Sequence, residues 1–438
     1  MSETGHRQLR AELTTTRIAL TIEAAHFSMI EVLSGPAAAS IEKNNMNVAM
    51  LLSCGSFEGF YGRVQGQSRQ SYLEGFRNDW AWYYGRGLLE NGIQPLLYIP
   101  SLYEAGKYET DAGIPVRFLP LARWFRPMEQ LSLTRLSRVT GWSLYAVEVL
   151  NTIAFIGPLR AALREDDIDV LYVQEHWSGR FDYIVRELDL PVVGADHGGV
   201  ADGVVKLFKR RALEKAAMCY GQTEGECRMV ERFGGRAKLQ PNGCDVSEFF
   251  PDPAVQRDKT VLTVTRLTNK QKRTTDLIKA MAELPEEWTL DIVGTGPDRE
   301  MLERLAADLK LSSRVRFHGF VGRAAVRDLF RRCGVYAMPS ANEGLAVAAL
   351  EAMACGAAVV LSQIRAFEPL VTDGVNGRLV PVGDVKGLAA AIIDAWKHRE
   401  SLGAAAFDTV RTRYNTHVLY SQLADSLRDC LRQSSAKR

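Results

Sequence analysis

Two glutamates stand in a stretch that is otherwise small and apolar, ANEGLAVAALEAMACG, at residues 341–356. Glu343 and Glu351 are separated by seven residues, and an apolar run, GVYAMPS, precedes them as an expected strand. We expect a helix from Gly344 onward. The unpaired N–H groups of its first turn and the positive end of its dipole would favour a phosphate group, which the small residues would let approach the backbone.

The spacing of these two carboxylates limits the chemistry they could share. On one continuous helix they would lie about 12 Å apart along the axis, at roughly 1.5 Å per residue. The two carboxylates of a glycoside hydrolase stand about 5 Å apart in retaining enzymes and about 6.5 to 9.5 Å apart in inverting ones. Hydrolysis is therefore disfavoured, and the distance suits an extended ligand with a diphosphate near the helix start. Without a ligand, Glu343 would be a first-turn residue favoured by the dipole and Glu351 an exposed helix residue.

A basic cluster, TVTRLTNKQKRTTDLIKAM, follows another expected strand. Arg266 lies at the end of that strand and Lys272 six residues later, just before a helix. Two cations at a strand end could neutralise a leaving diphosphate. Lys270 and Arg273 compete with Lys272 for this role, and a solvated basic loop is the alternative.

Two further loops follow expected strands. Gly294 and Gly296, in DIVGTGPDREML, form a weak nucleotide-loop signal, because the full dinucleotide fingerprint is absent and the turn needs glycine in any case. His197, in VVGADHGG, follows a strand among glycines, so it could face a ligand or be a structural histidine. His176, in VQEHWSGRF, is a weaker candidate, and Glu175 beside it is weaker still.

Apolar runs of strand length alternate with segments of helix length along most of the chain. Before residue 250 we expect strands in MNVAMLLS, IQPLLYIP, DVLYVQE, PVVGADHGG and AAMCYGQT. After it we expect them in TVLTVTRL, WTLDIVGTG, RVRFHGFV, GVYAMPS, GAAVVLS and GRLVPVG, with helices at 274–284, 298–309 and 385–397. This alternation predicts an α/β fold with two Rossmann-like, doubly wound domains facing a cleft.

The periodicity stops around FFPDPAVQRDK, where two prolines and several charges intervene, so we expect a domain boundary there. The expected parts are an extension outside the fold (1–45), an N-terminal domain (46–250), a C-terminal domain (251–400) and a helical segment that packs back on the N-terminal domain (401–438).

The charge balance, 54 Lys and Arg against 52 Asp and Glu, produces no global field, so no nucleic-acid partner is expected. The densest basic stretch, KLFKRRALEK at 206–215, reads as the solvated face of one helix or as a contact with an anionic membrane surface. DDID, at 166–169, has a spacing that could hold a divalent metal. It precedes a strand, away from the ligand-binding edge, so we expect no metal site there.

Seven scattered cysteines without a C-x-x-C pair indicate reduced thiols and a cytoplasmic protein. The most apolar segment, WSLYAVEVLNTIAFIG, contains Glu148 and Asn151, so no membrane span is expected. RIALTIEAAHFSMIEVLSG, near the N-terminus, contains Glu23, His26 and Glu31 and does not read as a signal peptide.

Together these stretches resemble the family 4 retaining glycosyltransferases (glycosyltransferase group 1), which have the two-Rossmann GT-B fold. The resemblance covers Met46 to the C-terminus and is strongest from Pro241 to Asp384. It rests on PNGCD (241–245), Arg266 with Lys272, VGTGP, RVRFHGFV, Glu343 with Glu351, AMACGAAVVLS and GVNGRLVPVGD.

The resemblance implies a role for each matching residue. Glu343 would hydrogen-bond the donor sugar, Glu351 the ribose hydroxyls, and backbone amides near Gly344 and Leu345 the diphosphate. Arg266 and Lys272 would stabilise the leaving nucleoside diphosphate, and His197 would contact the sugar from the N-terminal domain. Gly294, Gly296 and Asn242 would complete the donor site.

The same resemblance implies an acceptor domain followed by a nucleotide-sugar donor domain, and transfer with retention without a metal, a cofactor or a protein nucleophile. Two loops depart from the family pattern. SCGSFEGFYGR lacks an adjacent glycine pair, which affects acceptor recognition, and TNKQKR lacks the glycine that usually follows the lysine.

The expected function is therefore that of a hexosyltransferase in polysaccharide biosynthesis. It would move a hexose from a nucleotide diphosphate sugar to a glycan, a lipid-linked oligosaccharide or an exopolysaccharide acceptor, in the cytoplasm and with peripheral membrane contact left open. A nucleotide-sugar epimerase of the same fold and a non-catalytic GT-B partner subunit are the alternatives. An epimerase would need more groups suited to proton transfer, and intact Glu343, Glu351, Arg266 and Lys272 argue against the partner subunit.

Overall fold

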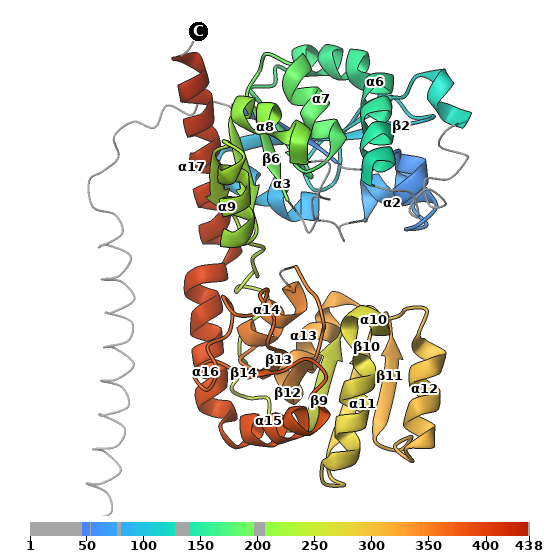
Figure 1. Ribbon diagram of the computed structural model, residues 1–438, viewed down its shortest axis with the longest axis vertical. Helices are drawn as coiled ribbons and strands as arrows, with labels where there is room; N and C mark the ends of the chain where they lie inside the picture. Colours follow the sequence, from blue (N-terminus) through green and yellow to red (C-terminus); the bar gives the residue numbers. More distant parts are fainter. Residues whose placement is uncertain are drawn as a thin grey trace, which may run out of the picture. The chain divides into compact units, whose positions relative to one another are not determined.

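The computed structural model describes residues 46–52, 54–76, 80–127, 141–196, 206–344 and 346–436, and they form two sheets with helices on both faces (Figure 1). The first sheet has eight strands in the order β3-β4-β2-β1-β5-β6-β7-β8. All neighbours pair in parallel except β3 and β4. The strands are β1 (Met46–Leu51), β2 (Ile93–Ser101), β3 (Gly106–Tyr108), β4 (Val116–Pro120), β5 (Val170–Gln174), β6 (Val192–Ala195), β7 (Met218–Gly221) and β8 (Ala237–Leu239).

Helices cover both faces of this sheet because its central strands are apolar on both sides. In β1, Val48 and Met50 enter one hydrophobic core, whereas Ala49 and Leu51 enter the other. Around the first sheet the helices are η1 (Glu58–Gly62), α2 (Arg69–Glu74), α3 (Trp80–Glu90), η2 (Arg123–Phe125), α6 (Gly141–Glu165), α7 (Gly179–Glu187), α8 (Lys206–Lys215) and α9 (Glu224–Arg232). Residues of α2 and α3 pack into the first core, and residues of α6 to α9 into the second.

The second sheet has six strands, all parallel, in the order β11-β10-β9-β12-β13-β14. They are β9 (Asp258–Val264), β10 (Thr289–Val293), β11 (Val315–Gly319), β12 (Cys333–Met338), β13 (Ala358–Ser362) and β14 (Arg378–Val380). Figure 1 shows α11 (Thr274–Glu283) and α12 (Arg299–Asp308) beside these strands. Other helices here are α10 (Asn269–Lys272), α13 (Arg323–Arg332), α14 (Val347–Ala354), α15 (Val385–Lys397), α16 (Arg399–Thr409) and η3 (Val410–Tyr414).

The last helix, α17 (Thr416–Ser435), belongs to the core of the first sheet. Its residues Tyr420, Leu423 and Leu427 are buried there together with residues of α3. The approach is so close that a Cβ atom on Gly87 would lie 2.1 Å from the Tyr420 ring. Glycine at this position of α3 is therefore required by packing.

The expected α/β class with doubly wound parallel sheets is confirmed, and the expected strands and helices are present. Three short strands, β3, β4 and β8, were not predicted. In β4 the apolar run is broken by Arg117, whose Nε lies 2.6 Å from Asp166 Oδ2. That pairing lets a buried strand contain a charged residue. It also occupies a carboxylate of the DDID loop.

In the described part of the chain, one helical segment, Leu144–Glu165 of α6, is long and apolar enough to cross a membrane by length and composition alone. This differs from the expectation that no segment qualifies. One face of this helix packs in the core, because Phe155 and Leu159 are fully buried against the first sheet. Asn151 is also buried and donates to the carbonyl of Gly55 at 2.8 Å.

The basic stretch of residues 206–215 is helix α8. The expectation that its basic residues form a solvated face is wrong for one lysine. Lys209 is completely buried, and its Nζ lies 2.7 Å from Asp182 Oδ1 and donates to the carbonyls of His176 and Ser178. Asp182 also accepts a hydrogen bond from Tyr145. Lys209 therefore anchors α8 to α7 and to the loop after β5.

The seven cysteines all have free thiols, and only Cys227 is not fully buried. Burial raises the pKa of the Cys219, Cys333 and Cys355 thiols to about 12. These thiols are therefore protonated at neutral pH.

Candidate functional site

A pocket of about 270 Å³ opens where two adjacent strands of the second sheet end. β9 and β12 are neighbours in the sheet, so their carboxyl ends bring the loops that follow them together. The pocket is lined by Val264, Thr265, Arg266, Gln271, Lys272, Met338, Glu343, Ala346, Val347 and Ala348. Three of the expected site residues, Arg266, Lys272 and Glu343, thus meet in one cavity.

Lys272 and Glu343 form a nearly buried ion pair in this pocket. Lys272 Nζ lies 2.6 Å from Glu343 Oε1, with side-chain exposures of 15% and 7%. Gln271 strengthens the link between the same two loops, because its side chain donates to the carbonyl of Asn342 and its carbonyl accepts from the N–H of Ala341. These two hydrogen bonds hold together the loops that carry Lys272 and Glu343.

Arg266 is exposed at the edge of the pocket, in the loop that follows β9. Two glycines in the loop that follows β10 pack closely against the backbone of this loop. A Cβ atom on Gly294, whose φ is +127°, would lie 1.9 Å from the carbonyl oxygen of Thr265, and one on Gly296 would lie 2.3 Å from that of Leu267. Neither glycine lines the pocket. The structure thus assigns both a packing role beneath Arg266, and their contact with a ligand stays a prediction.

The helix expected from Gly344 begins later, which corrects the geometry of the two glutamates. α14 starts at Val347, and Glu343 lies in the preceding loop. An axial separation of about 12 Å on one helix is therefore wrong, because only Glu351 is helical. The first N–H groups of the helix belong to Val347 and Ala348, which line the pocket.

Glu351 lies on the second turn of α14, where it is only 8% exposed, so the alternative of an exposed helix residue is wrong. Arg323, the first residue of α13, places its Nη1 2.9 Å from Glu351 Oε1. Arg323 is itself held by Glu248, whose two carboxylate oxygens each lie 2.8 Å from its Nε. Glu351 therefore stands next to a fixed cation.

Burial, together with the negative charge of Glu248, raises the pKa of Glu351 to about 7 against the opposing effect of Arg323. A carboxyl group loses hydration when it is buried, which disfavours its charged form. Glu351 thus titrates close to neutral pH. Shifted groups of this kind occur at ligand sites and in structural ion pairs alike.

Glu351, Asn242 and Gly344 are expected site residues that do not line this pocket. Asn242 hydrogen-bonds with Gln222 at 3.1 Å and does not line the pocket. His197 and Leu345 lie outside the described residues. Their expected contacts with the donor stay predictions, as does that of Gly344.

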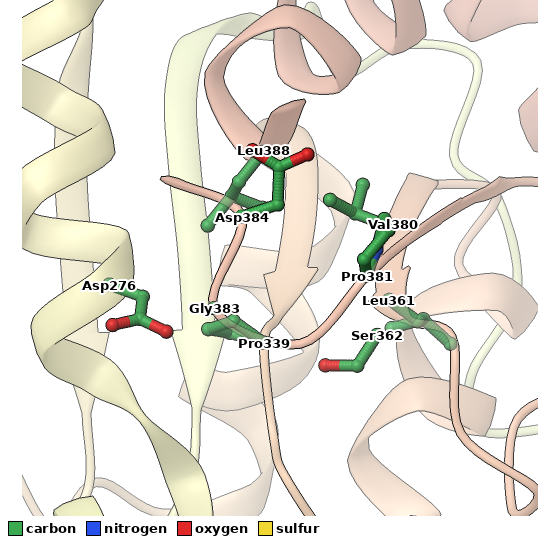
Figure 2. A pocket seen from close by; sticks show the side chains of 9 residues that line it. All are labelled: Asp276, Pro339, Leu361, Ser362, Val380, Pro381, Gly383, Asp384 and Leu388. Atoms are coloured by element: carbon green, nitrogen blue, oxygen red, sulfur yellow. The ribbon is translucent and has the colours of Figure 1, made fainter. Parts of the chain in front are cut away.

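A second cavity in the same sheet is too small for a substrate. Figure 2 shows its lining side chains, which include Asp276, Ser362 and Asp384. The cavity measures about 10 Å³, barely enough for one water molecule. Its carboxylates are already used, since Asp276 pairs with Arg273 and Asp384 accepts from the N–H of Gly387.

In the described ranges, no group of three or more His, Cys, Asp and Glu residues is arranged to hold a metal ion. Sequence reasoning missed Arg323, Glu248 and Gln271. Arg323 follows the expected strand RVRFHGFV, but nothing in the sequence links it to a glutamate 28 residues later. A contact of this kind depends on how α13 packs against α14.

Two largely parallel sheets with helices on both faces are the architecture of the GT-B fold. Comparison with solved structures agrees. The sucrose-phosphate synthase of Thermosynechococcus elongatus matches with a TM-score of 0.67 at 19% identity, over 89% of this chain and 100% of that one. HepE from Anabaena, in complex with UDP, matches with a TM-score of 0.64 at 18% identity, over 88% of this chain and 100% of that one.

A family model described as "Glycosyl transferases group 1" matches residues 246–406. The phosphatidyl-myo-inositol mannosyltransferase of Mycobacterium tuberculosis is 34% identical over 285 residues, which cover 60% of this chain and 74% of the relative. That of Mycolicibacterium smegmatis is 29% identical over 281 residues, with coverage of 60% and 71%. The chain belongs to the group 1 glycosyltransferases of family 4, the family that its sequence resembles.

Proposed function

We propose that this glycosyltransferase moves a hexose from a nucleotide diphosphate sugar to a glycan or lipid-linked acceptor, with retention of configuration and without a metal. The observation that carries the proposal is the meeting of Arg266, Lys272 and Glu343 in one pocket beside the start of α14. Such a pocket offers two cations and a helix start to a diphosphate and a carboxylate to a sugar hydroxyl.

In this proposal the diphosphate lies between Arg266 and the N–H groups of Val347 and Ala348. Lys272 has three N–H donors, so one can stay on Glu343 while the others reach a phosphate oxygen. Charge that develops on the leaving group is then stabilised by groups already in position. Glu343, oriented by Lys272, accepts a hydrogen bond from a hydroxyl of the transferred sugar, and Glu351 binds the ribose.

Retention is proposed to follow from attack on the same face from which the nucleotide leaves. Among the described residues that line the pocket, Glu343 is the one carboxylate, and Lys272 holds it as an ion pair. A carboxylate engaged in this way is a poor nucleophile. Departure of the diphosphate and arrival of the acceptor hydroxyl on one face would therefore pass through an oxocarbenium-like state, with the proton passing to the leaving phosphate.

The acceptor class is proposed from the relatives. They include phosphatidyl-myo-inositol mannosyltransferases, a lipopolysaccharide core biosynthesis glycosyltransferase of Rhizobium meliloti and an amylovoran biosynthesis glycosyltransferase of Erwinia amylovora. Their names span lipid and polysaccharide acceptors. We therefore propose an acceptor of one of these two kinds, and a cytoplasmic enzyme that makes peripheral contact with the membrane.

The test is a panel of UDP- and GDP-linked hexoses incubated with lipid and glycan acceptors. We expect nucleoside diphosphate release that depends on an acceptor, persists in EDTA, and yields a product with the anomeric configuration of the donor by NMR. Lys259→Met, which removes an exposed lysine paired with Glu287, is the matched control for Lys272→Met. Epimerised donor without transfer would replace the proposal by an isomerase, and an inverted product would overturn retention.

A further inference from the structure

Arg323 stands between Glu351 and three other groups that fix its position. Its guanidinium lies over the ring of Phe249 at 4.6 Å and over that of Tyr83, on α3, at 5.4 Å. Glu248 holds its Nε through both carboxylate oxygens. Because these contacts do not involve Glu351, the cation would keep its place whether or not Glu351 is charged.

Glu351, by contrast, has one cation. Arg323 Nη1 binds its Oε1, whereas Oε2 has no hydrogen-bond donor among the residues that the structure describes. A carboxylate can accept at both oxygens, so Oε2 keeps its capacity for a ligand. Glu351 also lies three and four residues after Ala348 and Val347, which line the pocket, so on the helix it lies on the same side one turn further along, beyond the lining itself.

We propose that Arg323 is a positioning residue for the donor nucleotide, holding Oε1 of Glu351 so that the ionised carboxylate is favoured and Oε2 is available to the ribose hydroxyls. The inference rests on the proposed binding of ribose by Glu351. It adds a residue whose effect is exerted through Glu351 and depends on pH.

The charges around Glu351 support this assignment. The titratable and charged groups that interact with it are Arg323, Glu248, Tyr83, Cys244, Tyr336 and Cys355. Of these groups only Arg323 is a cation. Burial and Glu248 favour protonated Glu351, so the ionised form at neutral pH depends on Arg323. Protonation would replace an acceptor pair of electrons with an O–H group and weaken the hold on two ribose hydroxyls.

The test compares ribonucleotides with their dideoxy forms by titration calorimetry between pH 6 and pH 9. The probes are UDP and GDP, each beside its 2′,3′-dideoxy form. Both members of a pair carry the same diphosphate, so its own titration cancels in the affinity ratio. In the wild type, we expect the preference for ribose to rise as the pH passes through about 7.

Arg323→Gln should move that rise to higher pH. We expect the ribose preference to fall about fivefold at pH 7, as for a pKa shift of about one unit, and to recover to nearly the wild-type value by pH 9. Arg316→Gln is the matched control, because Arg316 pairs with Asp291 at 2.6 Å on β10 and should leave the profile unchanged. Arg323→Lys, which changes the clamp less, should give a smaller shift in the same direction and carries the test if Arg323→Gln does not fold. Glu248→Gln removes a charge that favours protonated Glu351 and should move the rise to lower pH.

Glu351→Gln separates this inference from the proposed function on which it rests. We expect a low ribose preference that does not change with pH. If Glu351→Gln keeps the wild-type preference, the ribose role of Glu351 fails and the inference with it. If Glu351→Gln loses the preference while the Arg323 variants keep the wild-type pH profile, the inference alone is overturned.

Discussion

Nζ of Lys272 lies 2.6 Å from Oε1 of Glu343, and this ion pair joins the loop after β9 to the loop after β12. The pair has a counterpart in Arg323 and Glu351, at 2.9 Å. Each of the two glutamates is thus bound by a cation from another element. Lys272 of α10 binds Glu343, and Arg323 of α13 binds Glu351. The two carboxylates therefore have separate environments and separate tasks.

Lys272→Met should lower kcat by about 100- to 1000-fold, the range found when one preorganised electrostatic group is removed from an active site. The loss has two causes, since the leaving diphosphate loses a cation and Glu343 loses the group that orients it. Steady-state kinetics with the best donor of the panel measures it. Lys259→Met, at an exposed ion pair, should remain within about twofold of the wild type, and a similar kcat in both variants would contradict the role of Lys272.

Glu351→Gln should change how the free energy of unfolding depends on pH. In the folded protein the pKa of Glu351 is raised from 4.5 to about 7, so between these values the folded state binds a proton that the unfolded state has lost. The resulting stabilisation is fully present below pH 4.5 and is lost as the pH rises through about 7. Glutamine does not titrate and lacks this dependence.

The free energy of unfolding of the wild type, relative to Glu351→Gln, should therefore fall by on the order of 3 kcal/mol between pH 5 and pH 8. Urea unfolding of both proteins at each pH measures the difference. Glu303→Gln, on an exposed ion pair with Arg299, is a control that should show little change. A constant difference between wild type and Glu351→Gln would mean that burial does not raise the pKa of Glu351.

Lys209→Met should lower the free energy of unfolding by about 3 to 5 kcal/mol, because it leaves the buried carboxylate of Asp182 without its cation. The neighbouring residue Arg210 provides the control. Its side chain is 74% exposed and pairs with Glu214, so Arg210→Ala should leave the urea midpoint nearly unchanged. Equal urea midpoints for the two variants would show that Lys209 is solvated in solution.

Gly294→Ala should reduce both stability and donor binding, since the new Cβ would lie 1.9 Å from the Thr265 carbonyl at a φ that favours glycine. The strain would displace the loop that carries Arg266. Gly225→Ala is the control, because its nearest neighbour would be Thr223 Oγ1 at an ordinary 3.7 Å. Thermal unfolding and UDP titration of both variants provide the measurement, and an unchanged Gly294→Ala would remove the packing role of that glycine.

Much of the fold could be predicted because central parallel strands are continuous apolar runs. β1, β9 and β13 stand out in the sequence for this reason. β4 did not, because Arg117 interrupts it and its compensating partner, Asp166, is 49 residues away. Local pattern contains no information about a partner at that distance.

The same limit applies to the site. Lys272 and Glu343 were identified from their motifs, yet the sequence did not reveal that the two side chains form an ion pair. The start of α14 was placed too early because the small residues after Gly344 are compatible with a helix, whereas in the structure the helix begins only at Val347. Lys209 was predicted to be solvated because KLFKRR places basic residues on every face of the helix. The face that carries Lys209 is buried because it packs against α7, where Asp182 pairs with Lys209.

The position of α17 has a consequence for biosynthesis. Tyr420, Leu423 and Leu427 complete the hydrophobic core of a sheet whose first strand begins at Met46. A ribosome, working at about 5 to 20 residues per second, makes these residues after the strands of both sheets. The first sheet must therefore wait, with the apolar face that α17 will cover still open to water, for roughly ten seconds or more while the second half of the chain is translated.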